Sequence, residues 1–248
     1  MQNIIVIGDT HANFRYLNRI IAEEHPDIIF VCGDFGYWNK AIFKAGSGMF
    51  HDDIQNGETK IYFCDGNHED HSKLQQLVKI HGWKKPIEVS KNIYYCPRGS
   101  SLVLEDGRKV LFFGGAKSTD REMRLAYFDW FPEEMISSAE FERVQEGEQY
   151  DIVVSHTCPT ILVNRMLFDI GASTTFYNRD SCCDALQAVY ETVKPSQWFF
   201  GHWHDEKTIN EKFILFKTKK IVALTGNTRA LALALVYITF IGSMLIAN

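Results

Sequence analysis

Short apolar runs recur along this chain of 248 residues, and most of them end in a polar side chain. Runs of this length are typical of buried β-strands. They occupy residues 3–7, 27–32, 60–64, 110–113, 151–155, 198–200, 213–216 and 221–224. Because helix-like segments separate several of these runs, the order of elements predicts an α/β protein rather than a helical bundle or an all-β barrel.

Four segments between the runs carry helical periodicity or capping signals. The predicted helices span residues 13–24, 70–81, 137–146 and 181–193. Pro26 stops the first helix, and Gly82 follows the second. Ser137 with Glu140 three residues later forms a capping box, which predicts where the third helix begins.

Composition limits what the chain can bind. A hydrophobic content of 46% supports the core of one domain. The net charge of -5 and a pI near 6.0 give no broad basic surface, so we expect no extended nucleic-acid surface. A phosphorylated small molecule or peptide stays a candidate substrate, because metal ions can supply positive charge locally.

Cysteine usage and the chain ends bear on location. The six cysteines show no C-x-x-C pair, which predicts reduced thiols, and the first residues enter a strand without a signal peptide. We therefore expect a cytoplasmic protein.

Residues 230–248 carry no charged side chain and approach the roughly 20 residues that cross a bilayer. A membrane tail anchor is one interpretation; β-branched residues such as Val236 and Ile238 favour a buried element instead.

The ends of the predicted strands carry the residues suited to chemistry, because ligands of α/β folds collect beyond the carboxyl ends of strands. These ends read Gly8-Asp9-Thr10-His11, Gly33-Asp34, Gly66-Asn67-His68-Glu69, Ser155-His156 and Gly201-His202-Trp203-His204. Oxygen and imidazole donors without thiolate suit divalent manganese, iron or zinc. Two ions that share a carboxylate can clamp both oxygens of a phosphoryl transfer.

This series of motifs resembles the signature of the calcineurin-like metallophosphoesterase superfamily, which reads G-D-x-H, G-D, G-N-H-E, a late His and G-H-x-H. The resemblance spans residues 8–204. It implies a four-layer α/β/β/α sandwich of two mixed sheets, with a site at one edge that hydrolyses a phosphomonoester or phosphodiester. We predict this catalytic domain over residues 1–227, followed by an apolar tail of open role over 228–248.

The resemblance also implies a role for each motif residue. The ligands of the first ion would be Asp9, His11, Asp34 and His204. Those of the second would be Asp34, Asn67, His156 and His202, so that Asp34 bridges the two ions. His68 would be the catalytic acid and would contact the phosphoryl group together with Asn67. The nucleophile would be a water or hydroxide activated by both ions.

One motif departs from the protein Ser/Thr phosphatases of this superfamily. Those enzymes continue G-D with V-D-R-G, whereas this chain reads Phe35-Gly36-Tyr37-Trp38 after Asp34. The aspartate that orients the catalytic histidine and the arginine that binds phosphate are both missing there. The departure disfavours a protein phosphatase and leaves the orientation of His68 unexplained. Tyr37 and Trp38 either stack on a substrate ring or pack the loop.

Residues 117–131 are predicted to form a substrate lid. Arg121 and Arg124 are its candidate phosphate ligands, since an arginine can bind phosphate oxygens bidentately. Arg165 and Arg179 are further candidates, and a solvated loop without a role is the alternative.

Two other functions stay open. One is a non-catalytic metal-binding scaffold of the same fold, which is disfavoured because all the expected site residues are present. The other is a nuclease acting on short nucleic acid.

Overall fold

The computed structural model describes residues 2–39, 49–144, 147–169, 171, 179–204, 207–208, 212–215 and 222–223. Within these residues, the strands form two six-stranded sheets. In order across the first sheet they are β12 (Val222–Ala223), β1 (Ile4–Ile7), β2 (Ile28–Val31), β3 (Lys60–Phe63), β5 (Ile93–Tyr95) and β4 (Ile87–Ser90). The second sheet contains β10 (Lys207–Thr208), β11 (Phe213–Leu215), β9 (Gln197–Phe200), β8 (Ile152–Ser155), β7 (Lys109–Phe113) and β6 (Ser101–Val103).

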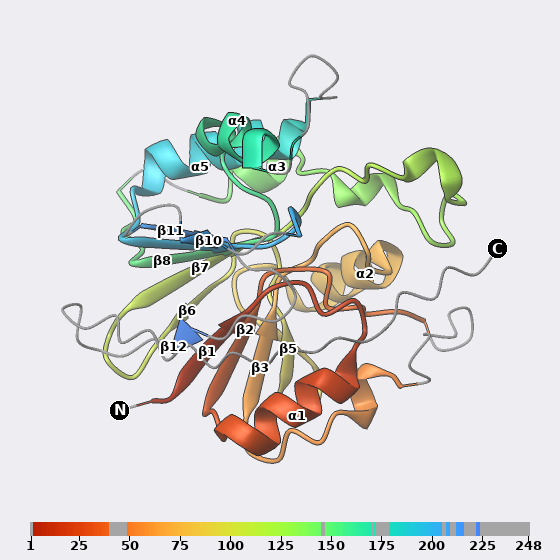
Figure 1. Ribbon diagram of the computed structural model, residues 1–248, viewed down its shortest axis with the longest axis vertical. Helices are drawn as coiled ribbons and strands as arrows, with labels where there is room; N and C mark the ends of the chain where they lie inside the picture. Colours follow the sequence, from red (N-terminus) through yellow and green to blue (C-terminus); the bar gives the residue numbers. More distant parts are fainter. Residues whose placement is uncertain are drawn as a thin grey trace.

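Both sheets are mixed in the same way: four central strands run parallel and the two edge strands run antiparallel to them. Helices α1 (Phe14–Glu24) and α2 (His71–His81) pack outside the first sheet, and α4 (Thr160–Asp169) and α5 (Ser181–Val193) cover the second. Figure 1 shows the resulting order of helices, sheet, sheet and helices. The predicted four-layer α/β/β/α sandwich is confirmed.

The apolar core divides into three layers because successive side chains of a strand point to opposite faces of its sheet. On β1, Ile5 and Ile7 face the helices, whereas Ile4 and Val6 face the other sheet. Between the sheets, the ring of Phe30 meets that of Phe112 edge to face at 5.4 Å. Strands buried on both faces read as continuous apolar runs, which explains why the sequence reveals them so clearly.

Three of the predicted helices form where expected. Asn13, Asp70 and Asp180 cap α1, α2 and α5, each with a side-chain oxygen that accepts a backbone N–H. The third prediction is too long. The capping box at Ser137 and Glu140 is present, but the helix it begins, α3 (Ser138–Phe141), has only four residues.

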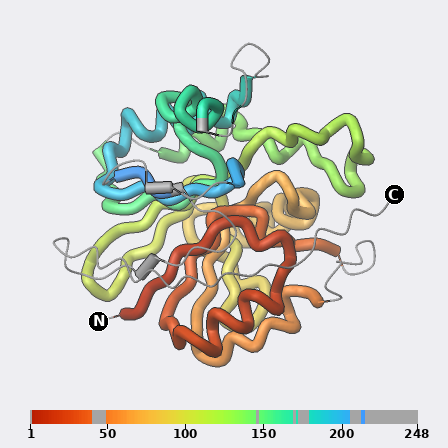
Figure 2. Tube along the Cα trace, in the orientation of Figure 1, coloured from red at the N-terminus to blue at the C-terminus, as the bar shows by residue number. Residues whose placement is uncertain are grey.

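The lid predicted at residues 117–131 leaves the second sheet after β7 and contains the single 3-10 turn η2 (Arg121–Met123), followed by η3 (Pro132–Glu134). Figure 2 shows this segment in green, extending beside α2.

The apolar tail at 228–248 lies outside the described residues. No helix among the residues that the structure describes is both long and apolar enough to span a bilayer. All six cysteines are buried.

Candidate metal centre

The five predicted motifs meet at one edge of the sandwich, where the carboxyl ends of β1, β2 and β3 face those of β8 and β9. Backbone hydrogen bonds tie the loops together: the N–H of His11 donates to the carbonyl of Asp34 at 2.7 Å, and that of Gly201 donates to His156 at 2.8 Å. Loops from strands in both sheets therefore build this one site.

Two carboxylates stand at the centre of the site, between two sets of imidazole rings. On one side, Asp9 Oδ2 lies 3.4 Å from His204 Nε2, and Asp34 Oδ2 lies 3.6 Å from His11 Nδ1. On the other side, Asp9 Oδ1 and Asp34 Oδ1 lie 3.8 and 3.4 Å from ring nitrogens of His156. Both aspartates are almost fully buried. Both carboxylates therefore lie between the two sets of rings, and the role of Asp34 as the bridge between two ions stays a prediction.

His156 is fully buried and oriented by the backbone. Its Nδ1–H donates to the carbonyl of Cys32 at 2.8 Å, which turns Nε2 toward Asn67 Oδ1 at 3.0 Å. A hydrogen bond of this kind fixes the tautomer of metal-binding histidines. Burial by itself lowers the pKa of His156, but the adjacent Asp34 and Asp9 carboxylates raise it to about 10. The two carboxylates thus make this part of the site strongly negative.

The amide of Asn67 is oriented by two residues that sequence reasoning missed. Its Nδ2 donates to Ser118 Oγ at 3.3 Å, and Ser118 donates through both Oγ–H and N–H to the buried Glu134 carboxylate, at 2.5 and 2.8 Å. With its nitrogen engaged, Asn67 presents its oxygen to the site. The sequence gives no signal of this contact, because Ser118 and Asn67 are 51 residues apart.

The backbone of the site is held in an unusual conformation. Four non-glycine residues of the motifs have positive φ: His11 at 46°, Asp34 at 47°, His202 at 70° and His204 at 50°. Left-handed backbone is uncommon outside glycine, and it collects at functional sites where the surrounding structure enforces it. The neighbouring glycines permit the close approach. A Cβ on Gly66 would collide with the Asp34 carboxylate, and one on Gly201 would collide with that of Asp9.

His68 contacts the lid rather than the loop that follows Asp34. The guanidinium of Arg124 lies against its ring, with Nη2 2.9 Å from Nδ1 and 2.6 Å from Nε2. Asp120 holds Arg124 through Nε at 2.9 Å. Burial, together with the positive charge of Arg124, lowers the pKa of His68 to about 4. The structure thus brings one of the two lid arginines to the site.

The other candidate residues lie elsewhere. Arg121 lies over the Trp130 ring, with its guanidinium carbon 4.2 Å from the ring centroid. Arg179 pairs with Asp184 at 2.8 Å, and Arg165 is exposed on α4. Tyr37 packs into the core beside Phe63, with ring centroids 6.0 Å apart.

The loop that replaces V-D-R-G is fixed by Glu69, the last residue of G-N-H-E. Its buried carboxylate accepts the backbone N–H groups of Phe35, Gly36 and Tyr37, at 2.7, 3.1 and 2.5 Å. The N–H of His68 donates in turn to Asp34 Oδ1 at 2.7 Å. The two motifs therefore hold each other in place without an aspartate or an arginine in the loop.

The donor set fits divalent metal ions. Three overlapping groups of side chains place their ligand atoms within 4.8 Å of one another: Asp9 with His11 and His204, His11 with Asp34 and His68, and Asp9 with Asp34 and His156. The ring of His202 lies 4.9 Å from that of His156, and burial lowers the pKa of His202 to about 3. A neutral imidazole of this kind has a lone pair to offer an ion.

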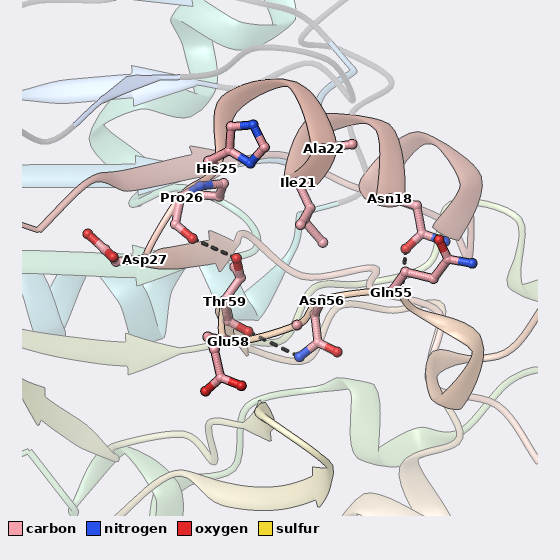
Figure 3. Close-up of a pocket in the computed structure, with 11 residues that line it drawn as sticks. Asn18, Ile21, Ala22, His25, Pro26, Asp27, Gln55, Asn56, Glu58 and Thr59 are labelled. Carbon is pink, nitrogen blue, oxygen red and sulfur yellow. Dashed lines mark hydrogen bonds between the residues drawn. The ribbon is translucent and has the colours of Figure 1, made fainter.

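A separate hollow of about 410 Å³ lies at the opposite end of the first sheet (Figure 3). It is lined by residues that precede β2 and β3, and their polar atoms bond one another: Thr59 Oγ1 donates to the carbonyl of Pro26 at 2.6 Å, and Asn56 Nδ2 donates to that of Thr59 at 3.0 Å. These contacts are those of a structural loop junction. The chemistry therefore centres on the other end of the strands.

Comparison with known proteins gives a family match and matches to solved structures. The sequence matches the family described as "Calcineurin-like phosphoesterase" over residues 2–206. A solved structure of GAP50, the anchor in the inner membrane complex of Plasmodium, superposes with a TM-score of 0.44 at 10% identity. That superposition covers 87% of this chain and 71% of the other. No curated protein matches the sequence.

Proposed function

The chain belongs to the calcineurin-like phosphoesterase family, and from that premise we propose that it hydrolyses a phosphate ester with the help of two divalent metal ions. The observation that carries the proposal is the pair of buried carboxylates, Asp9 and Asp34, each facing imidazoles on two sides. Divalent ions bound there would activate a water molecule and offset the negative charge of the phosphoryl group. Manganese, iron and zinc are the candidates, because the donors are oxygen and imidazole.

The proposed ligands are the seven residues of the motifs. One side of the site would use Asp9, His11, Asp34 and His204, and the other Asp34, Asn67, His156 and His202. The backbone carbonyl of Cys32 fixes the ring of His156, and Ser118 fixes the amide of Asn67. The ligand atoms are therefore held in place before an ion arrives, which reduces the ordering that binding requires.

His68 and Arg124 are the proposed contacts for the phosphoryl group. They lie together at the rim of the site, and the guanidinium offers several N–H donors in a planar arrangement that matches phosphate oxygens. Bound phosphate would take over donors that Arg124 directs at His68. His68 is then placed to contact the leaving oxygen, and the negative charge of bound phosphate would raise its pKa toward the range of a general acid.

Hydrolysis assays on metal-stripped protein test the proposal. We would supply a chromogenic phosphomonoester or phosphodiester, with manganese, iron, zinc or no metal added back. Asp34→Asn removes a central carboxylate charge, and His68→Ala removes the proposed acid. His81→Ala is the matched control, because His81 is exposed at the end of α2.

Turnover that requires metal and is lost in Asp34→Asn would support the two-metal mechanism, and the preferred ester would separate phosphatase from phosphodiesterase activity. Unchanged turnover in His68→Ala would show that another group donates the proton. Tight binding of two ions without turnover of either ester would favour the scaffold alternative.

A further inference from the structure

A second cavity, of about 220 Å³, lies where the lid meets the start of α2. Its walls include Trp38 from the loop after Asp34, Asp70 and Lys73 from the start of α2, and Tyr127 from the lid. Two of these wall segments also belong to the metal centre: Asp70 follows His68 by two residues, and the lid carries the arginine that contacts His68. The cavity is thus built from the same two segments that carry His68 and Arg124.

The cavity is rich in aromatic side chains. Trp38, Tyr127, Phe128 and Phe131 all line it. The Phe131 ring lies 6.5 Å from that of Trp38 and 6.4 Å from that of Tyr127. Tyr127 and Phe128 keep 64% and 46% of their surface exposed, which is unusual for large aromatic residues in a protein without a partner at that place. Exposed aromatic faces are the surfaces on which planar ligands stack.

The backbone of the lid holds Tyr127 in a strained conformation. Its φ is 60°, a left-handed conformation that bulky residues rarely adopt, and its N–H donates to the carbonyl of Trp130 at 2.7 Å. Asp129 secures the same turn by accepting the N–H of Leu125 at 2.6 Å. Strain of this kind persists where surrounding contacts enforce it and often marks a ligand site. The turn therefore fixes the backbone that carries the exposed Tyr127 ring.

Polar groups of α2 line the cavity beside the rings. The Asp70 carboxylate is engaged as the helix cap, since its Oδ1 accepts the N–H of Lys73 at 3.1 Å. The half-buried Lys73 side chain adds an ammonium donor to the wall. Aromatic faces with donors beside them suit a planar ring that has hydrogen-bond acceptors on its edge. At about 220 Å³ the cavity is smaller than the roughly 300–1,000 Å³ of sites for larger ligands, so it holds a single ring system.

We infer that this cavity is the leaving-group subsite, and that the substrate is a phosphate ester whose alcohol carries a planar, hydrogen-bonding ring such as a nucleobase. This inference rests on the proposed hydrolysis at the adjacent metal centre. The phosphoryl group sits with His68 and Arg124 while the ring stacks against the exposed Tyr127. An aryl ring without acceptors would use the stacking faces but not the donors of α2.

Adenosine 5′-monophosphate and ribose 5-phosphate provide a matched pair of substrates, because they share the scissile ester and differ in the base. We expect kcat/KM to be at least about tenfold higher for the nucleotide, as stacking of one base commonly provides. Tyr127→Ala should remove most of this preference, because kcat/KM for the nucleotide should fall toward that for ribose 5-phosphate. Met123→Ala is the control, since Met123 is 83% exposed on the same lid and does not line the cavity.

Equal kcat/KM for both esters in the unaltered protein would overturn the subsite while leaving hydrolysis intact. If neither ester is turned over, binding of adenosine to metal-free protein, measured by calorimetry, decides the matter separately. Adenosine binding that weakens about tenfold in Tyr127→Ala, but not in Met123→Ala, supports the cavity even where the proposed hydrolysis fails. Absent binding, or equal binding in all three proteins, overturns it.

Discussion

The guanidinium of Arg124 covers the imidazole of His68, with Nη2 within 3 Å of both ring nitrogens. The contact joins residues 56 positions apart, and Asp120 completes it by pairing with Arg124 at 2.8 Å. The expected partner of His68, an aspartate in the loop after Asp34, is missing from this chain. A lid residue therefore contacts His68 in place of that aspartate.

Arg124→Ala should lower kcat/KM for any hydrolysed phosphate ester by about 10- to 100-fold, because a hydrogen bond to a charged group contributes about 1.5–3 kcal/mol. Inorganic phosphate should also inhibit the variant more weakly. Arg121→Ala provides the control, since Arg121 packs on Trp130 in the same lid. Equal losses in both variants would mean that the lid acts through its fold rather than through Arg124.

Ser118→Ala should weaken metal binding at one of the two positions by about tenfold, as loss of an outer hydrogen bond to a ligand typically does. Without Ser118 Oγ, the Asn67 amide loses the contact that turns its oxygen inward. Thr119→Ala, at the exposed neighbouring position, should leave binding unchanged. Equilibrium dialysis against manganese measures stoichiometry and affinity without reliance on turnover. Identical binding curves for the two variants would exclude the positioning role.

Gly66→Ala should abolish binding of at least one ion, because its Cβ would strike the Asp34 carboxylate and displace it. Gly82→Ala is the matched glycine control. Its Cβ would meet open space, and its φ of 80° costs only about 1–3 kcal/mol of stability. Metal content after dialysis, measured by mass spectrometry, should fall in the first variant alone. A fully loaded Gly66→Ala protein would contradict the crowding seen at this turn.

Arg98→Leu should lower the free energy of unfolding by about 3–5 kcal/mol, because it leaves charges buried without a partner. Arg98 is buried and pairs with Asp65 at 2.6 Å and Glu140 at 3.0 Å, and it also binds the carbonyl of Glu134 at 2.9 Å. These contacts join the end of β3 to the segment after the lid.

Arg179→Leu is the comparison for that measurement. Its pair with Asp184 is exposed, so chemical denaturation should show a change below about 1 kcal/mol. Similar losses in the two variants would show that the destabilisation comes from removing a large side chain rather than from leaving buried charges unpaired.

The sequence predicts the strands and helices that show a clear apolar run or helical periodicity, and it does not predict the elements that lack one. Strands β5 and β6 have three residues each, too few to establish alternation. In α4 the apolar residues surround the helix: Ile161 and Phe168 are 63% and 80% exposed while their neighbours are buried, which blurs the helical periodicity. The predicted capping box at Ser137 is present, but a cap marks only where a helix begins and does not indicate where it ends.

The sequence by itself determined the fold class and the motif residues, because each motif directly follows a buried run and parallel strands deliver their carboxyl ends to one edge. It did not determine what surrounds those residues. The contacts of His68 with Arg124, Asn67 with Ser118 and His156 with Cys32 join positions 56, 51 and 124 residues apart. Such contacts follow from the order of strands in the sheets and from the path of the lid, which depend on packing across the whole domain rather than on local periodicity.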